Sequence, residues 1–420
     1  MISSIGSLPT GPAAPGVLEI ALVSEHASPL AALGEVDAGG QNVHVACLAG
    51  ALADRGHRVT VYTRRDTPDL PDRVPLREGV QVHHVPAGPP EQLPKDELPP
   101  HMPEFGRYLA RIWRTRPPDL VHSHFWMSGL AALRAARETG LPLVHTYHAL
   151  GTVKRRHQQL ADTSPPQRIA CETEVGLGCD RIVATCRDEV AELTRMGIPT
   201  EKVTVVPCGV DTDRFTPRGP VAPRGTHPYR LLQCGRLVPR KGGAVSVAAL
   251  TLLPGAELVV VGGPRPHLLD DDPEVRRLRA LAHEAGVAHR VHFTGGLPSD
   301  RIPALLRSAD VVVCPADYEP FGIVPLEAMA CGRPVVASAV GGQLDTVADP
   351  GTGRLVPPRD PEALARAVGD LLADPAAREA CGVAGRRRVL SRYGWAQVAA
   401  ATETAYCEVL DEEEAATGAG

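Results

Sequence analysis

The sequence predicts an α/β fold in which two doubly wound, Rossmann-like domains face each other across a cleft. A chain of 420 residues is too long for one compact core. Short apolar runs alternate with helical patterns along most of the chain, and the continuous character of these runs is typical of parallel strands covered on both faces. The alternation of strand and helix patterns is interrupted once, by a Pro-, Gly- and Arg-rich stretch at residues 207–228, and continues after it.

The first half begins with an apolar strand at residues 18–23, a glycine loop and a helix over residues 42–55 that Gly56 ends. Further strands are expected at residues 58–62, 80–85, 119–122, 142–145, 181–184 and 203–206. We therefore assign residues 1–207 to a first Rossmann-like, acceptor-binding domain and residues 208–228 to a linker.

The second half repeats the pattern, with strands expected at residues 231–234, 257–261, 291–293, 310–314 and 335–337. Residues 229–395 then form a second Rossmann-like domain, whose motifs, described below, lead us to expect that it binds the nucleotide-sugar. We expect the last segment, residues 396–420, to cross back as a helix over 396–410 that packs on the first domain, with a frayed acidic tail after Asp411. Each domain binds ligands at the carboxyl ends of its strands.

Composition excludes several classes of protein. Charged residues make up 22% and the formal net charge is −5, which favours neither nucleic acid nor an anionic membrane as a partner. Ten isolated cysteines without a CxxC motif indicate reduced thiols. The N-terminus lacks the basic start and apolar core of a signal peptide, and no apolar run reaches the length of a membrane span. We expect a cytoplasmic protein; the sequence does not decide whether it forms a homodimer.

The strongest motif covers residues 319–332 and follows a buried strand. Its helix should begin near Gly322 or Ile323, which places Glu319 in the loop at the strand end and Glu327 about one turn into the helix. The first N–H groups of that helix, around Phe321, point to where an anion such as a diphosphate would bind. The carboxylates then accept hydrogen bonds from sugar hydroxyls: Glu319 from the transferred hexose, Glu327 from the ribose. The alternative is an ordinary glutamate near a helix N-terminus.

A second motif, residues 234–242, contains Arg236 and Lys241 directly after the first strand of the second domain. Both side chains can reach the cleft, where a departing nucleoside diphosphate develops negative charge. Losing one such fixed cation typically lowers the rate by ~10²–10³. Alone, an Arg and a Lys after a strand are also compatible with ordinary surface residues.

Two weaker features belong to the first domain. Gly39 and Gly40 lie in a loop that opens the first helix, where the absence of side chains lets a ligand approach the backbone. The loop is not GxGxxG, and no acidic residue follows at the spacing that binds a dinucleotide ribose. His124 ends a strand and should project into the cleft, where it could hydrogen-bond the donor sugar; a packed core histidine is the alternative.

The sequence offers no convincing metal site. His122 and His124 have a suitable spacing, but no third ligand cluster or carboxylate companion accompanies them. The Asp211-Thr212-Asp213 segment falls in the linker without a preceding strand. We therefore expect no metal and no cofactor.

Together these motifs resemble the retaining glycosyltransferases of the GT-B fold, specifically family 4, over residues 18 to about 410. Residues 207–211 and the Arg214-Phe215 pair support the resemblance. It implies that no divalent metal is needed. It also implies a role for each residue singled out above: the diphosphate is bound by Arg236 and Lys241, the ribose by Glu327, and the sugar by Glu319 and His124, with Gly40 beside the phosphates.

Within this family, the first half resembles the mycothiol-pathway enzymes that transfer N-acetylglucosamine from UDP to inositol phosphate. The matching stretches are residues 39–43, 95–99, 121–129 and 145–148. These enzymes grip the acceptor phosphate with an Asn, a Lys, a Tyr, a Thr and an Arg, which correspond here to Asn42, Lys95, Phe125, Ala149 and Arg168. Two hydroxyl donors are therefore missing, each worth about 1.5–3 kcal/mol to a charged ligand.

The missing hydroxyls favour an uncharged or cationic cyclitol, and the related enzymes of aminoglycoside antibiotic pathways make 2-deoxystreptamine our expected acceptor for N-acetylglucosamine from UDP-N-acetylglucosamine. Four alternatives stay open: a D-inositol-3-phosphate glycosyltransferase of mycothiol biosynthesis, an enzyme like sucrose-phosphate synthase, a UDP-sugar epimerase, and a nucleotide-sugar-binding module without activity. The first domain offers no evident nucleophile, so we expect the same-face retaining route that the resemblance implies. Uracil recognition is expected near residues 295–298.

Overall fold

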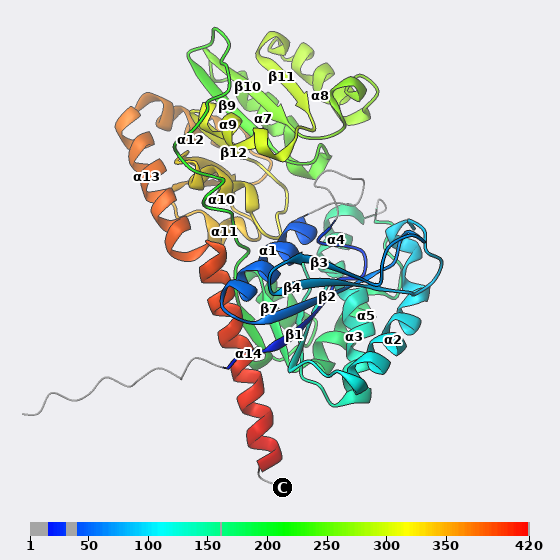
Figure 1. Ribbon diagram of the computed structural model, residues 1–420. Coiled ribbons are helices and arrows are strands. Elements are labelled where there is room, and N and C mark those ends of the chain that lie inside the picture. Colours follow the sequence, from blue (N-terminus) through cyan, green and yellow to red (C-terminus); the bar gives the residue numbers. More distant parts are fainter. Residues whose placement is uncertain (1–15, 31–39, 160–161, 419–420) are drawn as a thin grey trace, which may run out of the picture.

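The computed structural model describes residues 16–30, 40–159 and 162–418, which form two α/β domains, the second lying above the first in the view of Figure 1. One sheet has eight strands in the order β3-β4-β2-β1-β5-β6-β7-β8, and the other has six in the order β11-β10-β9-β12-β13-β14. Helices cover both faces of each sheet, and each sheet separates two apolar clusters. Within the described residues, no helix combines the length and the apolar character that a bilayer span needs.

The eight-stranded sheet contains every strand predicted for the first half, shifted by no more than two residues at either end. Its strands are β1 (Glu19–Val23), β2 (Arg58–Arg64), β3 (Arg73–Arg77), β4 (Val80–Val85), β5 (Leu120–His124), β6 (Leu143–Thr146), β7 (Arg181–Ala184) and β8 (Val203–Val205). The connecting helices are α1 (Gly40–Asp54), α2 (Met102–Thr115), α3 (Trp126–Thr139), α4 (Gly151–Gln158), α5 (Arg168–Gly178) and α6 (Arg187–Arg195). All neighbouring strands run parallel except β3, which pairs with β4 antiparallel.

The edge strand β3 escaped prediction because its residues alternate between exposed and half-buried positions and include Pro75. A proline is tolerated at a sheet edge, where its missing N–H costs no ladder hydrogen bond. Strand β14 (Gly353–Val356) escaped for a similar reason, since a glycine and an arginine interrupt its short apolar run.

The six-stranded sheet is built from β9 (Tyr229–Cys234), β10 (Ala256–Val261), β11 (Val291–Gly295), β12 (Val311–Cys314), β13 (Val335–Ser338) and β14. Its helices are α7 (Gly243–Leu250), α8 (Pro273–Glu284), α9 (Ile302–Ser308), α10 (Ile323–Ala330), α11 (Gln343–Thr346), α12 (Pro361–Ala373) and α13 (Pro375–Arg392). All strands of this sheet pair in parallel. Its strand order reverses between β9 and β12, as that of the first sheet does between β1 and β5. Ligands of doubly wound sheets bind at such switch points, so topology alone marks one binding edge on each sheet.

The last helix, α14 (Trp395–Gly418), leaves the second sheet and packs on α1 and β7 of the first (Figure 1). It continues past Leu410, so the frayed tail expected after Asp411 is not found up to Gly418. Arg181 of β7 contacts both the predicted part of this helix and its extension, because its guanidinium pairs with Glu408 at 3.5 Å and with Glu412 at 2.7 Å.

Candidate functional site

Two cations stand where β9 ends, at the switch point of the second sheet. Gly235 turns the chain with a φ of +140°, a conformation that side chains rarely adopt. Arg236 follows it with an exposed side chain, and the half-buried Lys241 ends a short 3-10 turn. The Gln233 side chain donates a hydrogen bond to the Lys241 carbonyl at 2.8 Å and fixes this loop to the strand.

Helix α10 brings the glutamate motif to the same place. It begins at Ile323, as predicted, with Gly322 preceding it at a φ of +74°. The Lys241 ammonium forms an ion pair with the Glu319 carboxylate, so the two motifs meet directly. Glu327 is half-buried, and burial raises the pKa of its carboxyl to about 7, with the Arg214 guanidinium acting in the opposite direction.

The hollow between these motifs is lined by residues at the ends of β9, β10 and β12 and at the starts of α10 and α11, among them Gln233, Gly235, Arg236, Lys241, Cys314, Glu319, Val324 and Gln343. Gly39 lies outside the described residues. Gly40 begins α1, and a Cβ added there would meet the Ile323 Cδ1 atom of α10 at 3.4 Å. The start of α1 thus adjoins the start of α10.

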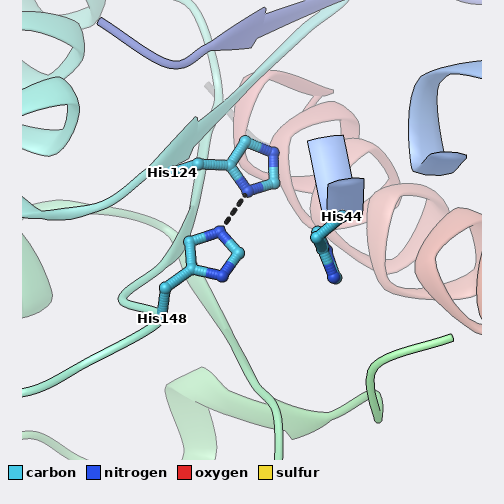
Figure 2. Close-up of side chains that lie close together, drawn as sticks. All are labelled: His44, His124 and His148. Atoms are coloured by element: carbon cyan, nitrogen blue, oxygen red, sulfur yellow. Dashed lines mark hydrogen bonds between the residues drawn. The ribbon is translucent and has the colours of Figure 1, made fainter. Parts of the chain in front are cut away.

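Histidines line the corresponding edge of the first sheet (Figure 2). His124 at the end of β5 is fully buried, and its Nδ1 atom lies 3.0 Å from Nε2 of His148, which follows β6. His148 adopts a φ of +62° and places its ring 5.7 Å from that of Phe321. His148 therefore makes the contact with the second sheet in the described structure, while His124 lies behind it. Burial lowers the pKa of both imidazoles well below the ordinary value, so both are neutral.

A cavity of about 330 Å³ opens between the two sheets beside these histidines. It is lined from the first sheet's side by Lys95, Phe125, Ala149, Lys154 and Arg168, and from the second by Arg236, Arg240, Tyr318 and Pro320, among others. Four of the five expected acceptor residues are thus brought together. The fifth, Asn42, is absent from this lining; its side-chain amide donates to the Ser28 carbonyl at 3.0 Å.

The Phe125 ring lies beneath two cations of the cavity, Lys95 and Arg168. Its φ of +79° is unusual for a residue with a side chain and costs of order 1–3 kcal/mol, a strain that is common at functional sites. The Lys95 ammonium lies 3.7 Å from the ring centroid, and the Arg168 guanidinium carbon lies 5.1 Å from it. Cation–π attraction therefore holds both charges at the cavity without a tyrosine hydroxyl.

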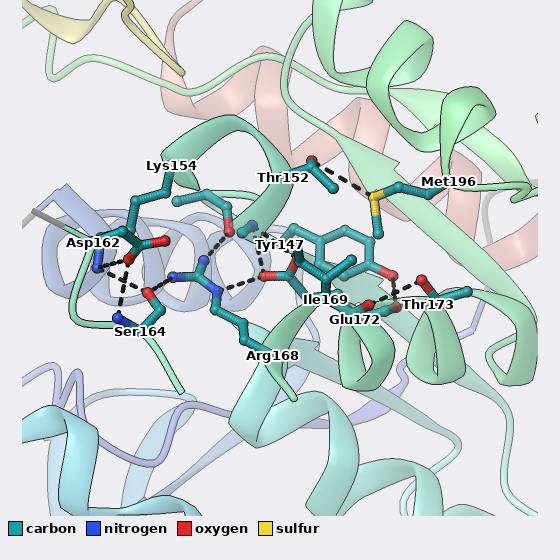
Figure 3. A network of polar contacts seen from close by, with 12 residues as sticks. Tyr147, Thr152, Lys154, Asp162, Ser164, Arg168, Ile169, Glu172, Thr173 and Met196 are labelled. Atoms are coloured by element: carbon teal, nitrogen blue, oxygen red, sulfur yellow. Dashed lines mark hydrogen bonds and ion pairs between the residues drawn. The ribbon is translucent and has the colours of Figure 1, made fainter. Parts of the chain in front are cut away.

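Arg168 is the centre of a buried polar network (Figure 3). It pairs with Glu172 at 2.7 Å, donates to the Ala149 carbonyl at 2.7 Å, and donates to the Ser164 hydroxyl at 3.2 Å. Burial raises the pKa of the Glu172 carboxyl and the neighbouring Arg168 charge lowers it. Lys154 joins from α4 through the same Ser164 hydroxyl, at 2.8 Å. The network therefore fixes both cations in place.

Three residues of the site escaped the sequence analysis: His44, His148 and Tyr318. His148 could have been found, because it follows β6 and so belongs to the same sheet edge as His124. His44 lies one turn inside α1, and only the packing of that helix brings it to this edge. Tyr318 lies just before Glu319, and its ring stacks on that of His157 at 5.0 Å, which adds another contact between the two sheets.

The sequence matches known protein families over both halves of the chain. Residues 38–214 match Glycosyltransferase Family 4, and residues 221–388 match Glycosyl transferases group 1. A D-inositol 3-phosphate glycosyltransferase from Xylanimonas cellulosilytica is 40% identical over 93% of this chain and 96% of its own length. The chain belongs to glycosyltransferase family 4. A second family member of the same name, from Acidothermus cellulolyticus, is 41% identical over 86% of this chain and 83% of its own.

Solved structures confirm the predicted GT-B fold of this glycosyltransferase. Sucrose-phosphate synthase from Thermosynechococcus elongatus superposes with a TM-score of 0.83 at 34% identity, covering 94% of this chain and 99% of its own. Anabaena HepE in complex with UDP-glucose has a TM-score of 0.69 at 19% identity, covering 94% and 100%, and shows the fold alone.

Both relatives reported above are named for D-inositol 3-phosphate. They give no support to the expected link with enzymes acting on 2-deoxystreptamine.

Proposed function

We propose that this glycosyltransferase moves a hexose, N-acetylglucosamine by preference, from a UDP-sugar to a hydroxyl of an anionic cyclitol, with D-inositol 3-phosphate as the leading acceptor. The observation that carries the proposal is the charge of the cavity between the sheets. Five of the residues that line it are cationic, namely Lys95, Lys154, Arg168, Arg236 and Arg240, and one, Asp96, is anionic. Such a lining favours a phosphorylated acceptor and repels an aminocyclitol. The names of the relatives point to the same acceptor.

The residues at the end of β9 support a donor site on the second sheet. Arg236 lines both the hollow at the end of β9 and the cavity between the sheets, so a diphosphate held by Arg236 and Lys241 would have its sugar at the boundary of the two. Glu319 and His124 would hold that sugar and Glu327 the ribose. The first N–H groups of α10 would complete the diphosphate site.

Transfer would retain the anomeric configuration without a metal ion in the reaction. Glu319 and Asp96 are the carboxylates among the residues lining these two spaces, and Glu319 is held by Lys241. Neither is arranged as the nucleophile that a double displacement would need. We therefore infer a same-face transfer in which Arg236 and Lys241 stabilise the departing diphosphate, which takes the proton of the incoming hydroxyl.

One observation favours a second candidate acceptor, 2-deoxystreptamine. Phe125 and Ala149 line the cavity with groups that donate no hydrogen bond from their side chains, so a phosphate there would lack two hydroxyl partners. Phe125 compensates by holding Lys95 and Arg168 over its ring, which is why we rank the anionic acceptor first.

The test is UDP release by the purified full chain from UDP-N-acetylglucosamine, with parallel wells for D-inositol 3-phosphate, unphosphorylated inositol, 2-deoxystreptamine, a hexose phosphate and no acceptor. Release that depends on D-inositol 3-phosphate, with an axial anomeric bond in the product by NMR, supports the proposal. Release with 2-deoxystreptamine alone overturns the acceptor. Release with the hexose phosphate alone favours an enzyme like sucrose-phosphate synthase, and release without acceptor favours an epimerase or a hydrolase. Binding of UDP without turnover in any well would contradict an enzyme of this kind.

A further inference from the structure

A second cavity, of about 510 Å³, lies at the opposite edge of the six-stranded sheet from the donor motifs. Asp310 directly precedes β12, and Arg333 and Pro334 directly precede β13, so this cavity adjoins the amino ends of these strands. Arg236 and Glu319, in contrast, follow the carboxyl ends of β9 and β12. Helix α13, orange in Figure 1, supplies the other main part of the lining. The residues that line this second cavity are all different from those of the two spaces described above.

Three arginines contribute to the lining of the second cavity. Arg333 comes from the loop between α10 and β13, and Arg378 and Arg386 lie about two turns apart on α13. Arg378 and Arg386 donate hydrogen bonds to main-chain carbonyls, which carry no formal charge. Among the described residues, none of the three arginines forms an ion pair with a carboxylate. Their positive charges are therefore concentrated at one place.

Arg333 is the arginine with the least compensation for its burial. Its side chain is half-buried, and its Nε atom is buried without a hydrogen-bond partner in the part of the chain that the structure describes. Burial lowers the pKa of its guanidinium; Asp310 acts in the opposite direction, and the charges of Arg224 and Arg378 add to the lowering. An arginine nevertheless keeps its proton in a protein. A bound anion would supply the partner that this buried cation lacks.

The carboxylates of the second cavity do not cancel this charge. Asp310 is already engaged, because it accepts hydrogen bonds from the Arg224 guanidinium at 2.6 Å and from the Arg230 N–H at 2.8 Å. Glu379 lies on α13 and is exposed, so water screens its charge. The three arginines therefore outweigh the one carboxylate that Arg224 does not neutralise.

A phosphate group matches this cavity in charge and in geometry. Guanidinium groups bind phosphate oxygens through pairs of charge-assisted hydrogen bonds. The volume lies in the range of small-molecule sites, about 300–1,000 Å³, and leaves room beside a phosphate. Pro217, Pro334 and Val383 line the same cavity with apolar surface that the remainder of a phosphate ester could contact.

We propose that the second cavity binds a phosphate-bearing small anion through Arg333 and Arg378, with Arg386 adding to the positive charge. The site lies apart from the transfer reaction, because it occupies the other edge of the sheet. Helix α10 links the two, since its start lines the donor hollow and Cys331 and Gly332, directly after its end, line the second cavity. The proposal does not depend on the donor or the acceptor proposed above, so either can fail alone.

The test is calorimetric titration of the full chain with glucose 6-phosphate, inorganic phosphate and glucose, in phosphate-free buffer at constant ionic strength. Saturating UDP keeps the diphosphate site occupied. We expect both phosphates to bind and glucose not to bind. Arg333→Gln should weaken phosphate binding by about tenfold or more, because it removes charge-assisted hydrogen bonds. Tighter binding of glucose 6-phosphate than of inorganic phosphate would identify the ligand as a phosphate ester, and the reverse order would identify it as the free ion.

A second variant distinguishes the site from general damage to the fold. Glu379→Gln removes a carboxylate that repels an anion, so it should strengthen phosphate binding by about two- to threefold. A destabilised protein would not show such a gain. The melting temperature of Arg333→Gln without phosphate should equal that of the parent chain, and added phosphate should raise the melting temperature of the parent more than that of the variant.

Two control variants locate the bound phosphate. Arg387→Gln changes an exposed arginine of α13 that is not part of the lining, and it should bind phosphate as the parent chain does. Lys95→Gln removes a cation from the cavity between the sheets and should leave the component that Arg333→Gln removes unchanged. Absence of phosphate binding overturns the proposal. So does a loss in Lys95→Gln instead of Arg333→Gln, or an equal loss in Arg333→Gln and Arg387→Gln.

Discussion

The two sides of the cavity obtain their functional groups in opposite ways. On the second sheet, Arg236, Lys241, Glu319 and Glu327 come from two short motifs, each directly after a strand at the switch point. On the first sheet, the groups come one or two at a time from a 3-10 turn, a strand end, two loops and two helices. Site residues that come from short local motifs can be predicted from the sequence. Site residues that come from separate elements can be identified only from the folded structure.

The two sides also differ in how they hold charge. Arg236 is exposed and Lys241 half-buried, so these cations are available to a ligand at little cost to the fold. Arg168 and Glu172 are buried with side-chain exposures of 6% and 0%, where each charge depends on the other. Substitutions on the second sheet should therefore change the rate of transfer, whereas those in the network of the first should change stability as well.

The largest effect is expected for Glu172→Ala, which leaves the buried Arg168 guanidinium without its carboxylate and Gly151 N–H without its acceptor. Removing one partner of a buried pair typically costs 3–5 kcal/mol of unfolding free energy, to be measured by urea denaturation. Glu174→Ala on the same helix is the control, because Glu174 is exposed and pairs loosely with Arg137 at 3.7 Å; it should change stability by less than about 1 kcal/mol. Equal losses in the two variants would show that the Arg168 network does not differ from the surface.

Arg236→Ala should reduce kcat for UDP release by ~10²–10³ while leaving the melting temperature nearly unchanged. The reason is that its guanidinium is exposed and, in the proposed function, stabilises the departing diphosphate. Arg366→Ala, an exposed arginine on α12, is the matched control and should retain full activity. A loss confined to KM would mean that Arg236 binds the ground state and does not stabilise the transition state.

The sequence was sufficient for the fold and for the donor side because both follow from local patterns. Continuous apolar runs located all strands except β3 and β14, whose Pro75 and Arg354 break that pattern. The start of α10 was predicted near Gly322 or Ile323, and the structure has it at Ile323, directly after a glycine with a positive φ.

The first sheet could not be predicted to the same depth, because its site depends on packing over long separations. Phe125 was interpreted as the loss of a hydroxyl, and the structure shows that the ring holds Lys95 and Arg168 instead. His124 was expected to project into the cleft, yet it is buried behind His148. No sequence spacing indicates that a helix residue such as His44 reaches the same edge.

Phe125→Tyr offers a smaller and sharper test of the first sheet. If the acceptor phosphate occupies the cavity, the added hydroxyl should lower KM for D-inositol 3-phosphate by about tenfold, the lower end of what one hydrogen bond to a charged ligand contributes. The activity on unphosphorylated inositol serves as the internal control and should not improve. A gain that is equal for both acceptors would place the phosphate elsewhere.

The smallest expected effect is a pH dependence of UDP affinity, caused by the ionisation of Glu327 on the second sheet. With the pKa of Glu327 at about 7, its ionised fraction rises from about a tenth at pH 6 to about nine tenths at pH 8. If the Glu327 carboxylate accepts hydrogen bonds from the ribose, as proposed, UDP affinity should rise with pH over this range. Calorimetric titration of Glu327→Gln with the same nucleotide removes this component, because the ionisation of UDP itself is common to both proteins. Parallel pH profiles for the two would contradict a ribose role for Glu327.

The chain passes between the sheets twice, and the two passages touch. Val210 donates a backbone hydrogen bond to the Tyr393 carbonyl at 2.8 Å and pairs in parallel with Gly394, while Trp395 fills the space beside Gly209. The two passages are therefore tied to each other at one point by a backbone hydrogen bond, an isolated β-bridge and a packed indole. A change in the angle between the two sheets would have to bend both passages together at this point.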